Sequence, residues 1–106
     1  MKNNSLGRIY ISGPISGLKF SVVERAFADA AADFDARGWL PDNPLRNGVP
    51  MTAAWEQHLA ADIIELIKCR AIYMLRGWKD SHGARLEHAI AKKCDLQIIY
   101  ENGDYA

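Results

Sequence analysis

The sequence predicts an α/β fold in which a four-stranded parallel sheet is covered by helices on both faces. Four short apolar segments are separated by three stretches whose apolar residues recur every three to four positions, so strands and helices alternate along the chain. Parallel neighbouring strands need crossover connections, and helices on both faces bury such apolar strands. At 106 residues the chain has the size of one domain, which we take as 1–106.

The first half of the chain is expected to form a strand, a helix and a second, short strand. Residues 8–12 (Arg-Ile-Tyr-Ile-Ser) are rich in β-forming types and are cut off by Gly13 and Pro14, which favour a turn. Residues 39–41 form a brief strand candidate, followed by a polar loop at 42–50. The helix between the strands ends at Gly38, and its apolar stripe consists of Phe20, Val23, Phe27, Ala30, Ala31 and Phe34.

The second half repeats this alternation, with strand candidates at 71–75 and 96–100. The second helix carries a stripe of Trp55, Leu59, Ile63, Leu66 and Ile67. A third helix is expected at 81–93, with a buried face of Leu86, Ala89, Ile90 and Cys94. Because crossovers in such sheets are right-handed, this order favours a small flavodoxin-like or Rossmann-like three-layer sandwich.

Composition argues against several classes of partner. Lys plus Arg (13) equals Asp plus Glu (13), so the chain lacks the positive field that a nucleic acid polymer or an anionic membrane surface requires. Neither a signal peptide nor a transmembrane segment is visible, and we expect a cytoplasmic protein. Cys69 and Cys94 form no CxxC pattern and are expected to be reduced thiols. The spacing of the histidines fits no metal site, and no cofactor is expected.

A candidate catalytic carboxylate stands in the segment 81–87 (Ser-His-Gly-Ala-Arg-Leu-Glu). Glu87 lies one helical turn past Gly83, under a gap without a side chain, just after a strand whose carboxyl end is where open α/β sheets bind small molecules. Asp80 and Ser81 are N-cap candidates whose polar groups can also meet a ligand. Taken alone, Glu87 is also compatible with an ordinary solvated position on a helix.

Asp62 is a second candidate, because it lies at the edge of an apolar stripe, between Leu59 and Leu66. A carboxylate there is costly to desolvate unless a partner stabilises it. One interpretation is a carboxyl group turned into a pocket, with a raised pKa suited to acid catalysis. The other is partial exposure, or a local bond to His58 one helical turn earlier.

The turn 13–17 (Gly-Pro-Ile-Ser-Gly) and two tryptophans are further candidates. Glycines near a strand end let the backbone approach a ligand, and free N–H groups there can hold an anion or hydroxyls. The turn matches neither the P-loop nor GxGxxG, and a purely structural turn is the alternative. Trp78, in the loop before the third helix, is expected to form a pocket wall, whereas Trp55 is expected in the core.

Several segments together resemble one small domain family found largely in phages and bacteria. They are 10–17, Asn43-Pro44, Asp62-Ile63 and 73–87, and the match spans residues 8–101. By these motifs the chain resembles the DUF4406 family, which is similar to the nucleoside 2-deoxyribosyltransferases and the 2'-deoxynucleoside 5'-phosphate N-hydrolases. The resemblance implies Glu87 as the nucleophile, Asp62 as the residue that handles the base or a proton, and Tyr10 near the nucleophile. Residues and resemblance together make the substrate-binding candidates Ser12, Gly13, Ile15, Ser16, Gly17, Asn43, Trp78, Ser81 and Gly83.

The chain departs from the N-hydrolase pattern, in which the glycine-rich turn and the SxG element hold the 5'-phosphate. Pro14 stands where the hydrolases have Ser, and Arg70 stands where relatives usually carry Asp. Ser16 stands where the hydrolases have Arg, and the missing Arg removes a bidentate clamp for phosphate.

The resemblance implies N-glycosidic cleavage, or deoxyribosyl transfer, on a 2'-deoxynucleoside or its 5'-monophosphate. Glu87 attacks C1' and expels the base, Asp62 protonates the base, and water or a second base releases the sugar. The alternatives are an NAD or ribonucleoside glycohydrolase and a non-catalytic nucleotide-binding or assembly protein. Because the relatives build their site between subunits, a homo-oligomer (dimer or larger) is expected, with the tail 101–105 reaching a neighbour's pocket.

Overall fold

A computed structural model describes residues 6–101 and confirms the α/β class predicted from the sequence. Four parallel strands form one sheet in the order β2-β1-β3-β4. The strands are β1 (Arg8–Ser12), β2 (Leu40–Asp42), β3 (Ala71–Met74) and β4 (Gln97–Tyr100). The helices are α1 (Phe20–Ala36), α2 (Trp55–Leu66) and α3 (His82–Lys93), with two short 3₁₀ turns, η1 (Pro44–Arg46) and η2 (Trp78–Asp80).

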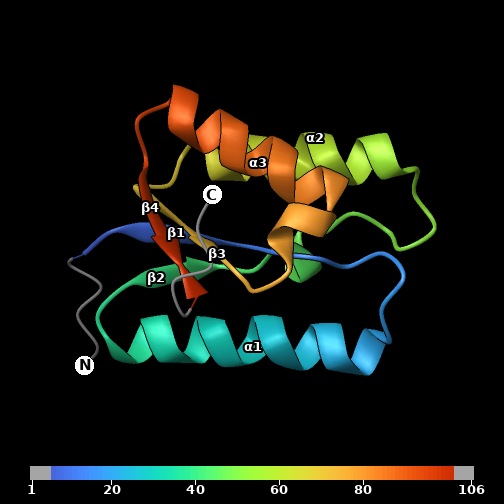
Figure 1. Cartoon of the computed structure of the whole chain (residues 1–106), viewed down its shortest axis with the longest axis horizontal. Helices are drawn as coiled ribbons and strands as arrows, with labels where there is room; N and C mark the ends of the chain where they lie inside the picture. Colours follow the sequence, from blue (N-terminus) through green and yellow to red (C-terminus); the bar gives the residue numbers. More distant parts are fainter. Residues whose placement is uncertain (1–5, 102–106) are drawn as a thin grey trace.

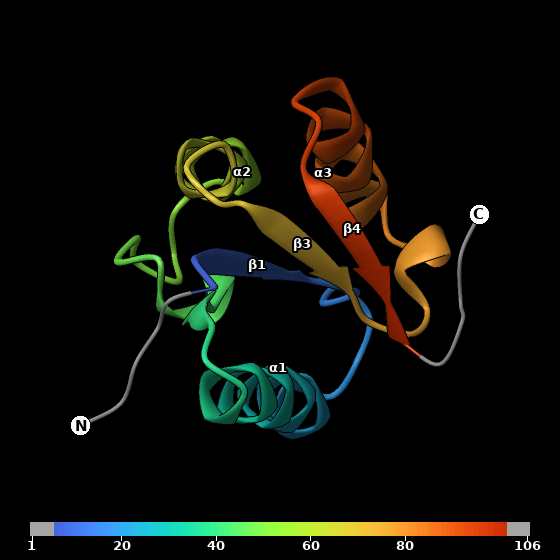
Figure 2. The ribbon, with the colours of Figure 1, turned by 90° about the vertical axis from the view of Figure 1, so that its left-hand side faces the viewer.

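The helices form two layers around the sheet, which gives the flavodoxin-like or Rossmann-like sandwich (Figure 1). Figure 2 shows α1 alone on one face of the sheet, whereas α2 and α3 lie side by side over the other. The chain moves from β1 outward to β2, crosses back to β3 and continues to β4, so the strand order reverses between β1 and β3. At such a switch point a crevice opens at the carboxyl ends of the strands.

The central strand β1 contacts both helical layers because its side chains alternate across the sheet. Ile9 and Ile11 belong to the core under α1, together with Phe27, whereas Tyr10 belongs to the core under α2 and α3. Both isoleucines are fully buried, and each such burial contributes about 1.5–3 kcal/mol to stability. The strand is therefore held from both sides just before the point where the crevice opens.

The buried face of α3 differs from the predicted one. The buried residues are Ala84, Glu87, His88 and Ala91. The predicted face is exposed or only half-buried at each of its positions, Leu86, Ala89, Ile90 and Cys94. The buried face includes two polar side chains because both are hydrogen-bonded: Glu87 to Tyr10 and Ser12 of β1, and His88 to Tyr100 of β4. Polar side chains can be buried when they have such hydrogen bonds, so the spacing of apolar residues alone did not predict this face.

Several expectations concern absences or residues at the chain ends. No helix within residues 6–101 is long and apolar enough to cross a membrane. Within the same range, no group of His, Cys, Asp and Glu side chains could hold a metal ion. Cys69 is buried and Cys94 exposed, and both are free thiols. The tail expected to reach a neighbouring pocket lies, from residue 102 onward, outside the described residues.

Candidate active site

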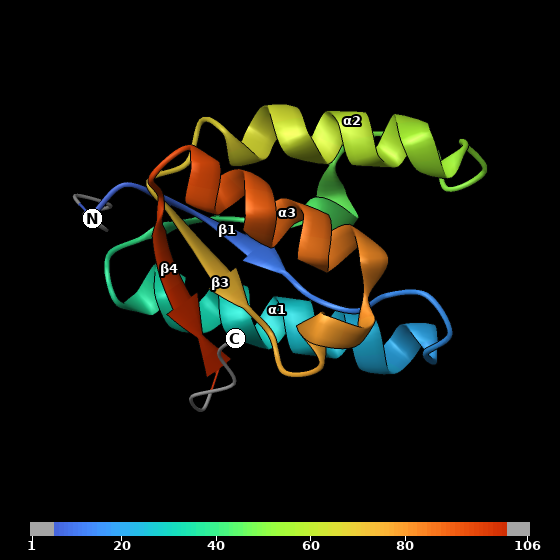
Figure 3. The same cartoon turned by 45° about the horizontal axis from the view of Figure 1, so that its top comes forward.

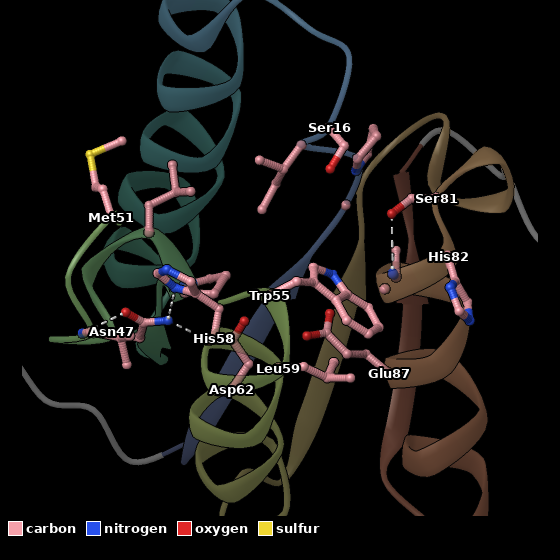
Figure 4. Close-up of a pocket in the computed structure, with 18 of the residues that line it drawn as sticks. Ser16, Asn47, Met51, Trp55, His58, Leu59, Asp62, Ser81, His82 and Glu87 are labelled. Atoms are coloured by element: carbon pink, nitrogen blue, oxygen red, sulfur yellow. Dashed lines mark hydrogen bonds between the residues drawn. The ribbon is translucent and has the colours of Figure 1, made fainter. Parts of the chain in front are cut away.

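A cavity of about 520 Å³ opens at the carboxyl ends of β1 and β3, where the strand order reverses. It lies between the turn after β1, the loop before α2, one side of α2 and the first two turns of α3 (Figure 4). This volume is within the range of small-molecule sites, roughly 300–1,000 Å³. The cavity is also at the edge where open α/β sheets bind their ligands.

Glu87 lines the cavity from the second turn of α3 and is only 7% exposed. Tyr10 donates its hydroxyl hydrogen to Oε2 at 2.8 Å, and Ser12 donates to Oε1 at 2.7 Å. Burial raises the pKa of Glu87 to about 7, although both hydrogen bonds favour the ionised form, and the nearby Asp62 raises it further. The carboxyl group therefore has a fixed orientation and titrates near neutrality.

Tyr10 and Ser12 are fully buried and two residues apart on β1, so their side chains leave the same face of the sheet. Burial and the charge of Glu87 raise the pKa of Tyr10 well above its usual value, and the phenol therefore stays a donor. Neither residue lines the cavity. The structure thus places Tyr10 beside Glu87, and it places Ser12, a substrate-binding candidate, behind the carboxyl group instead of in contact with a ligand.

Asp62 reaches the same cavity from α2, and Figure 4 shows Asp62 and Glu87 on opposite sides of that cavity. Asn47, in the loop before α2, donates its amide to Asp62 Oδ1 at 3.0 Å and lies 3.3 Å from Nδ1 of His58. Burial raises the pKa of Asp62, against the opposing effects of the Asn47 hydrogen bond and the nearby His58. Asp62 is thus a half-buried pocket carboxyl that is linked to His58 through Asn47.

The first turn of α3 leaves open space above Glu87. A Cβ atom added to Gly83 would meet no atom within 4 Å, so this glycine enlarges the cavity. Ser81 caps the helix, because its hydroxyl oxygen accepts the Ala84 N–H at 3.2 Å. Gly13, at the tip of β1, has a different role: a Cβ there would lie 2.7 Å from Leu75, so only glycine allows this close packing.

The aromatic wall of the cavity is formed by Trp55 rather than by the predicted Trp78. Trp55 is 48% exposed and stacks on His82 of α3, with ring centroids 5.6 Å apart. Its predicted core position was wrong because the first turn of α2 projects beyond the sheet (Figure 3), where no layer covers it. Trp78 is only 4% exposed and packs against His88 and Tyr100, away from the cavity lining.

Some of the remaining substrate-binding candidates line the cavity and others do not. Ser81 and Gly83 line the cavity, as do Gly13, Ile15 and Ser16 of the turn after β1. Gly17 and Asn43 do not line it. The Asn43 side chain instead caps η1, where its Oδ1 accepts the Leu45 N–H at 3.0 Å.

The family model of DUF4406, a domain of unknown function, matches residues 7–100. This chain belongs to the DUF4406 family. No curated protein matches the DUF4406 chain by sequence. Among solved structures it is similar to the CMP N-glycosidase BcmB of Clostridium botulinum, with a TM-score of 0.64, 19% identity and coverage of 93% of this chain and 74% of that chain. At this identity the likeness shows a shared fold.

Three functional candidates of the DUF4406 chain were missed by the sequence analysis. Asn47 is hydrogen-bonded to Asp62 and lies within hydrogen-bond distance of His58, which the sequence offered only as a local partner of Asp62, and His82 stacks on the tryptophan at the cavity wall. Of these three residues, only His58 could be connected to the site from the sequence, because it stands one helical turn before Asp62. Asn47 lies in a loop without periodicity, four residues after the asparagine that the resemblance suggested.

The charge of the cavity is uneven. Among the described residues that line it, three are acidic (Asp62, Asp80 and Glu87) and none is Lys or Arg. Two histidines, His58 and His82, also line it. The site of this DUF4406 protein therefore suits an uncharged ligand better than an anion.

Proposed function

We propose that this DUF4406 protein cleaves the N-glycosidic bond of 2'-deoxynucleosides, with Glu87 as the nucleophile. One observation carries the proposal: a buried carboxyl group, held at both oxygens by β1, faces a second carboxyl group, Asp62, across a cavity of small-molecule size. The name of the solved structure with a similar fold, an N-glycosidase, supports the same class of bond. The motifs shared with deoxyribosyltransferases add to that support.

Two steps complete the reaction. First, Glu87 attacks C1', the C1'–N bond breaks with its electron pair passing to the base, and Asp62 gives its proton to that base. General acid help of this kind is typically worth about 10²–10⁴-fold in rate. Second, a water molecule attacks C1' while Asp62 takes up its proton, and Glu87 leaves as a carboxylate. A second base in place of water gives deoxyribosyl transfer, so hydrolysis and transfer share the first step.

A 2'-deoxy sugar without a phosphate fits this scheme best. The transition state resembles an oxocarbenium ion, and a 2'-hydroxyl group would withdraw electrons from it. A 5'-phosphate would be desolvated beside Asp62, Asp80 and Glu87 with no lining Lys or Arg among the described residues, and an unpaired desolvated ion costs several kcal/mol. Ser16, where the N-hydrolases have Arg, is consistent with a nucleoside substrate.

A substrate panel tests the proposal. Deoxynucleosides, ribonucleosides and their 5'-monophosphates are incubated with the purified protein, and free base is measured by chromatography. The wild-type protein should release base from deoxynucleosides, whereas Glu87→Gln should not, because a neutral amide does not attack C1'. Glu56→Gln is the matched control, since Glu56 is exposed at the start of α2 and does not line the cavity.

Each outcome of the panel separates the candidates. Turnover retained by Glu87→Gln would remove Glu87 as the nucleophile. Binding without release of base, with or without an acceptor base, would favour the nucleotide-binding alternative. Faster release from ribonucleosides would favour the ribonucleoside glycohydrolase. The homo-oligomer implied by the resemblance stays a prediction.

A further inference from the structure

Three polar side chains on the α2 side of the cavity share one hydrogen-bond network. Asn47 Oδ1 accepts the Val49 N–H at 2.9 Å, so turning the amide around would place two donors face to face. The NH₂ group of Asn47 therefore points toward α2. There it meets Asp62 Oδ1 at 3.0 Å and His58 Nδ1 at 3.3 Å (Figure 4).

The orientation of Asn47 decides the tautomer of His58. An amide NH₂ can only donate, so Nδ1 carries a lone pair and the ring hydrogen is on Nε2. Within residues 6–101, no side chain is hydrogen-bonded to Nε2, and no fully buried side-chain nitrogen lacks a partner. Because the ring lines the cavity, its Nε2–H is a donor that a ligand can reach.

We propose that Asn47 is a positioning residue that holds His58, as the Nε2–H tautomer, beside Asp62, so that a departing base meets two hydrogen donors. The inference rests on the proposed function. Its substrates are nucleosides whose base offers two acceptor atoms on the α2 side, one for the Asp62 proton and one for the His58 N–H. Of the two, only Asp62 transfers its proton, whereas His58 keeps its own and stabilises negative charge on the base.

The chemistry of bond cleavage explains why two donors help. When the C1'–N bond breaks, its electron pair spreads over the ring nitrogens and carbonyl oxygens of the base. Protonation by Asp62 neutralises one of these atoms, and a preorganised donor stabilises the charge on another. Such a donor acts without reorganisation only if its orientation is fixed beforehand. Asn47 supplies that fixed orientation for both groups at once.

Asn47 also influences the acid strength of Asp62. The groups around Asp62 are His58 on its own helix, Asp42 on β2, Glu87 on α3 and Tyr10 on β1. The bond from Asn47 stabilises the carboxylate and lowers its pKa, against burial, which raises it. Asn47→Ala should therefore move the limb of the pH–rate profile that reports Asp62 to higher pH. A loss of packing alone would leave that limb in place.

Leaving-group ability provides the kinetic test. The substrates are the deoxynucleoside that the wild-type protein cleaves fastest and its nitro-substituted analogue, whose base leaves as a more stable anion and needs less protonation. Asn47→Ala and His58→Phe should lower kcat/KM on the first substrate by about 10²-fold. Their loss on the analogue should be at least about tenfold smaller. His58→Gln should recover part of the activity, because its amide places a donor near the position of Nε2.

Asn43→Ala is the matched control, since it changes an asparagine in the same loop that caps η1 and does not line the cavity. Any loss that it causes should be equal on both substrates. Nitrogen NMR of the imidazole provides a readout that needs no turnover. In the wild-type protein it should show a bare Nδ1 and a protonated Nε2 on His58, and Asn47→Ala should lose this preference.

The outcomes keep the two proposals apart. Equal losses on both substrates, or a hydrogen on Nδ1 of His58, would overturn the role of Asn47. Absence of base release by the wild-type protein would overturn the proposed function, and the NMR measurement would still decide whether Asn47 sets the tautomer. Selective loss together with the expected tautomer supports both.

Discussion

Glu87 combines two opposing demands on a single side chain. As a nucleophile it must be ionised, yet burial favours its neutral form and raises its pKa to about 7. The hydrogen bonds from Tyr10 and Ser12 favour the ionised form and limit this rise. The same burial that weakens the charge also keeps water from competing with the sugar for the carboxylate oxygens.

The pH dependence of base release follows from these groups. Glu87 must be ionised to attack, so its titration near pH 7 should form one limb of the pH profile of kcat/KM. Ser12→Ala should move this limb to higher pH, because it removes a bond that stabilises the carboxylate. Measurement of kcat/KM from pH 5 to 9 for both proteins checks the expectation.

The Ser12→Ala variant identifies the limb that belongs to Glu87. Because Asp62 and Glu87 interact, the apparent pKa values of the profile belong to the pair. A Ser12→Ala profile whose limbs both stay in place would show that Glu87 does not titrate in the reaction. Ser21→Ala, on the exposed side of α1, controls for the loss of a serine hydroxyl elsewhere in the chain.

Among the elements, the first turn of α3 shows how space for a ligand weakens a helix. Glycine lowers helix stability relative to alanine by about 1 kcal/mol. Gly83 has no positive φ, and its missing side chain would meet nothing within 4 Å. Neither backbone geometry nor packing therefore requires glycine at position 83. Glycine is needed there only to keep the space above Glu87 open for a ligand.

Gly83→Ala should accordingly stabilise the protein and weaken its function. We expect the free energy of unfolding to increase by up to about 1 kcal/mol, and KM for the nucleoside to increase because a methyl group occupies the space above Glu87. Urea unfolding and steady-state kinetics measure the two effects. An unchanged KM would show that the substrate does not use this space. Gly13→Ala is the contrasting variant and should destabilise, since its Cβ would clash with Leu75.

Local sequence patterns predicted the elements well because strands and helices bury apolar residues at their own periods. The strand at 8–12 and the helix that carries Glu87 were predicted correctly on that basis. Periodicity failed where burial depends on neighbours far along the chain. Trp55 follows the helical stripe but lies past the end of the sheet, while Trp78 is covered by Tyr100 of a strand that comes later.

Residue spacing predicted the open space of the site where residues stand one helical turn apart. Gly83 and Glu87 are one turn apart on one helix, so the open space above the carboxyl group follows from the sequence. Asn43 and Asn47 share a polar loop, and nothing local distinguishes the residue that caps η1 from the one that bonds Asp62. The course of that loop depends on tertiary contacts.

For the whole molecule, the buried carboxyl group links stability to pH. The pKa of Glu87 is about 7 in the folded chain against 4.5 ordinarily, so between these values the folded state binds more protons than the unfolded state. Stability should therefore fall as the pH rises from about 4.5 to about 7, and the shift corresponds to about 3 kcal/mol. The raised pKa of Asp62 acts in the same direction.

Glu87→Gln should remove most of this dependence. The amide keeps the shape of the carboxyl group and carries no charge, so the variant should be more stable than the wild-type protein at pH 8 and similar to it at pH 4.5. Urea unfolding of both proteins at the two pH values checks the expectation, with Glu56→Gln as the surface control. Parallel pH curves for the wild-type protein and Glu87→Gln would show that burial costs this carboxyl group nothing.

Tyr10 and Ser12 contact Glu87 from one face of β1, and Ile9 and Ile11 pack the opposite face of the same strand against α1. A change of side-chain shape at either isoleucine should shift β1, and this shift should move the hydroxyl groups that hold the carboxylate oxygens of Glu87. In laboratory evolution of this protein toward other sugars or bases, the positions that tolerate the fewest substitutions should thus lie away from the cavity wall. That restriction lies in the aliphatic layer beneath α1.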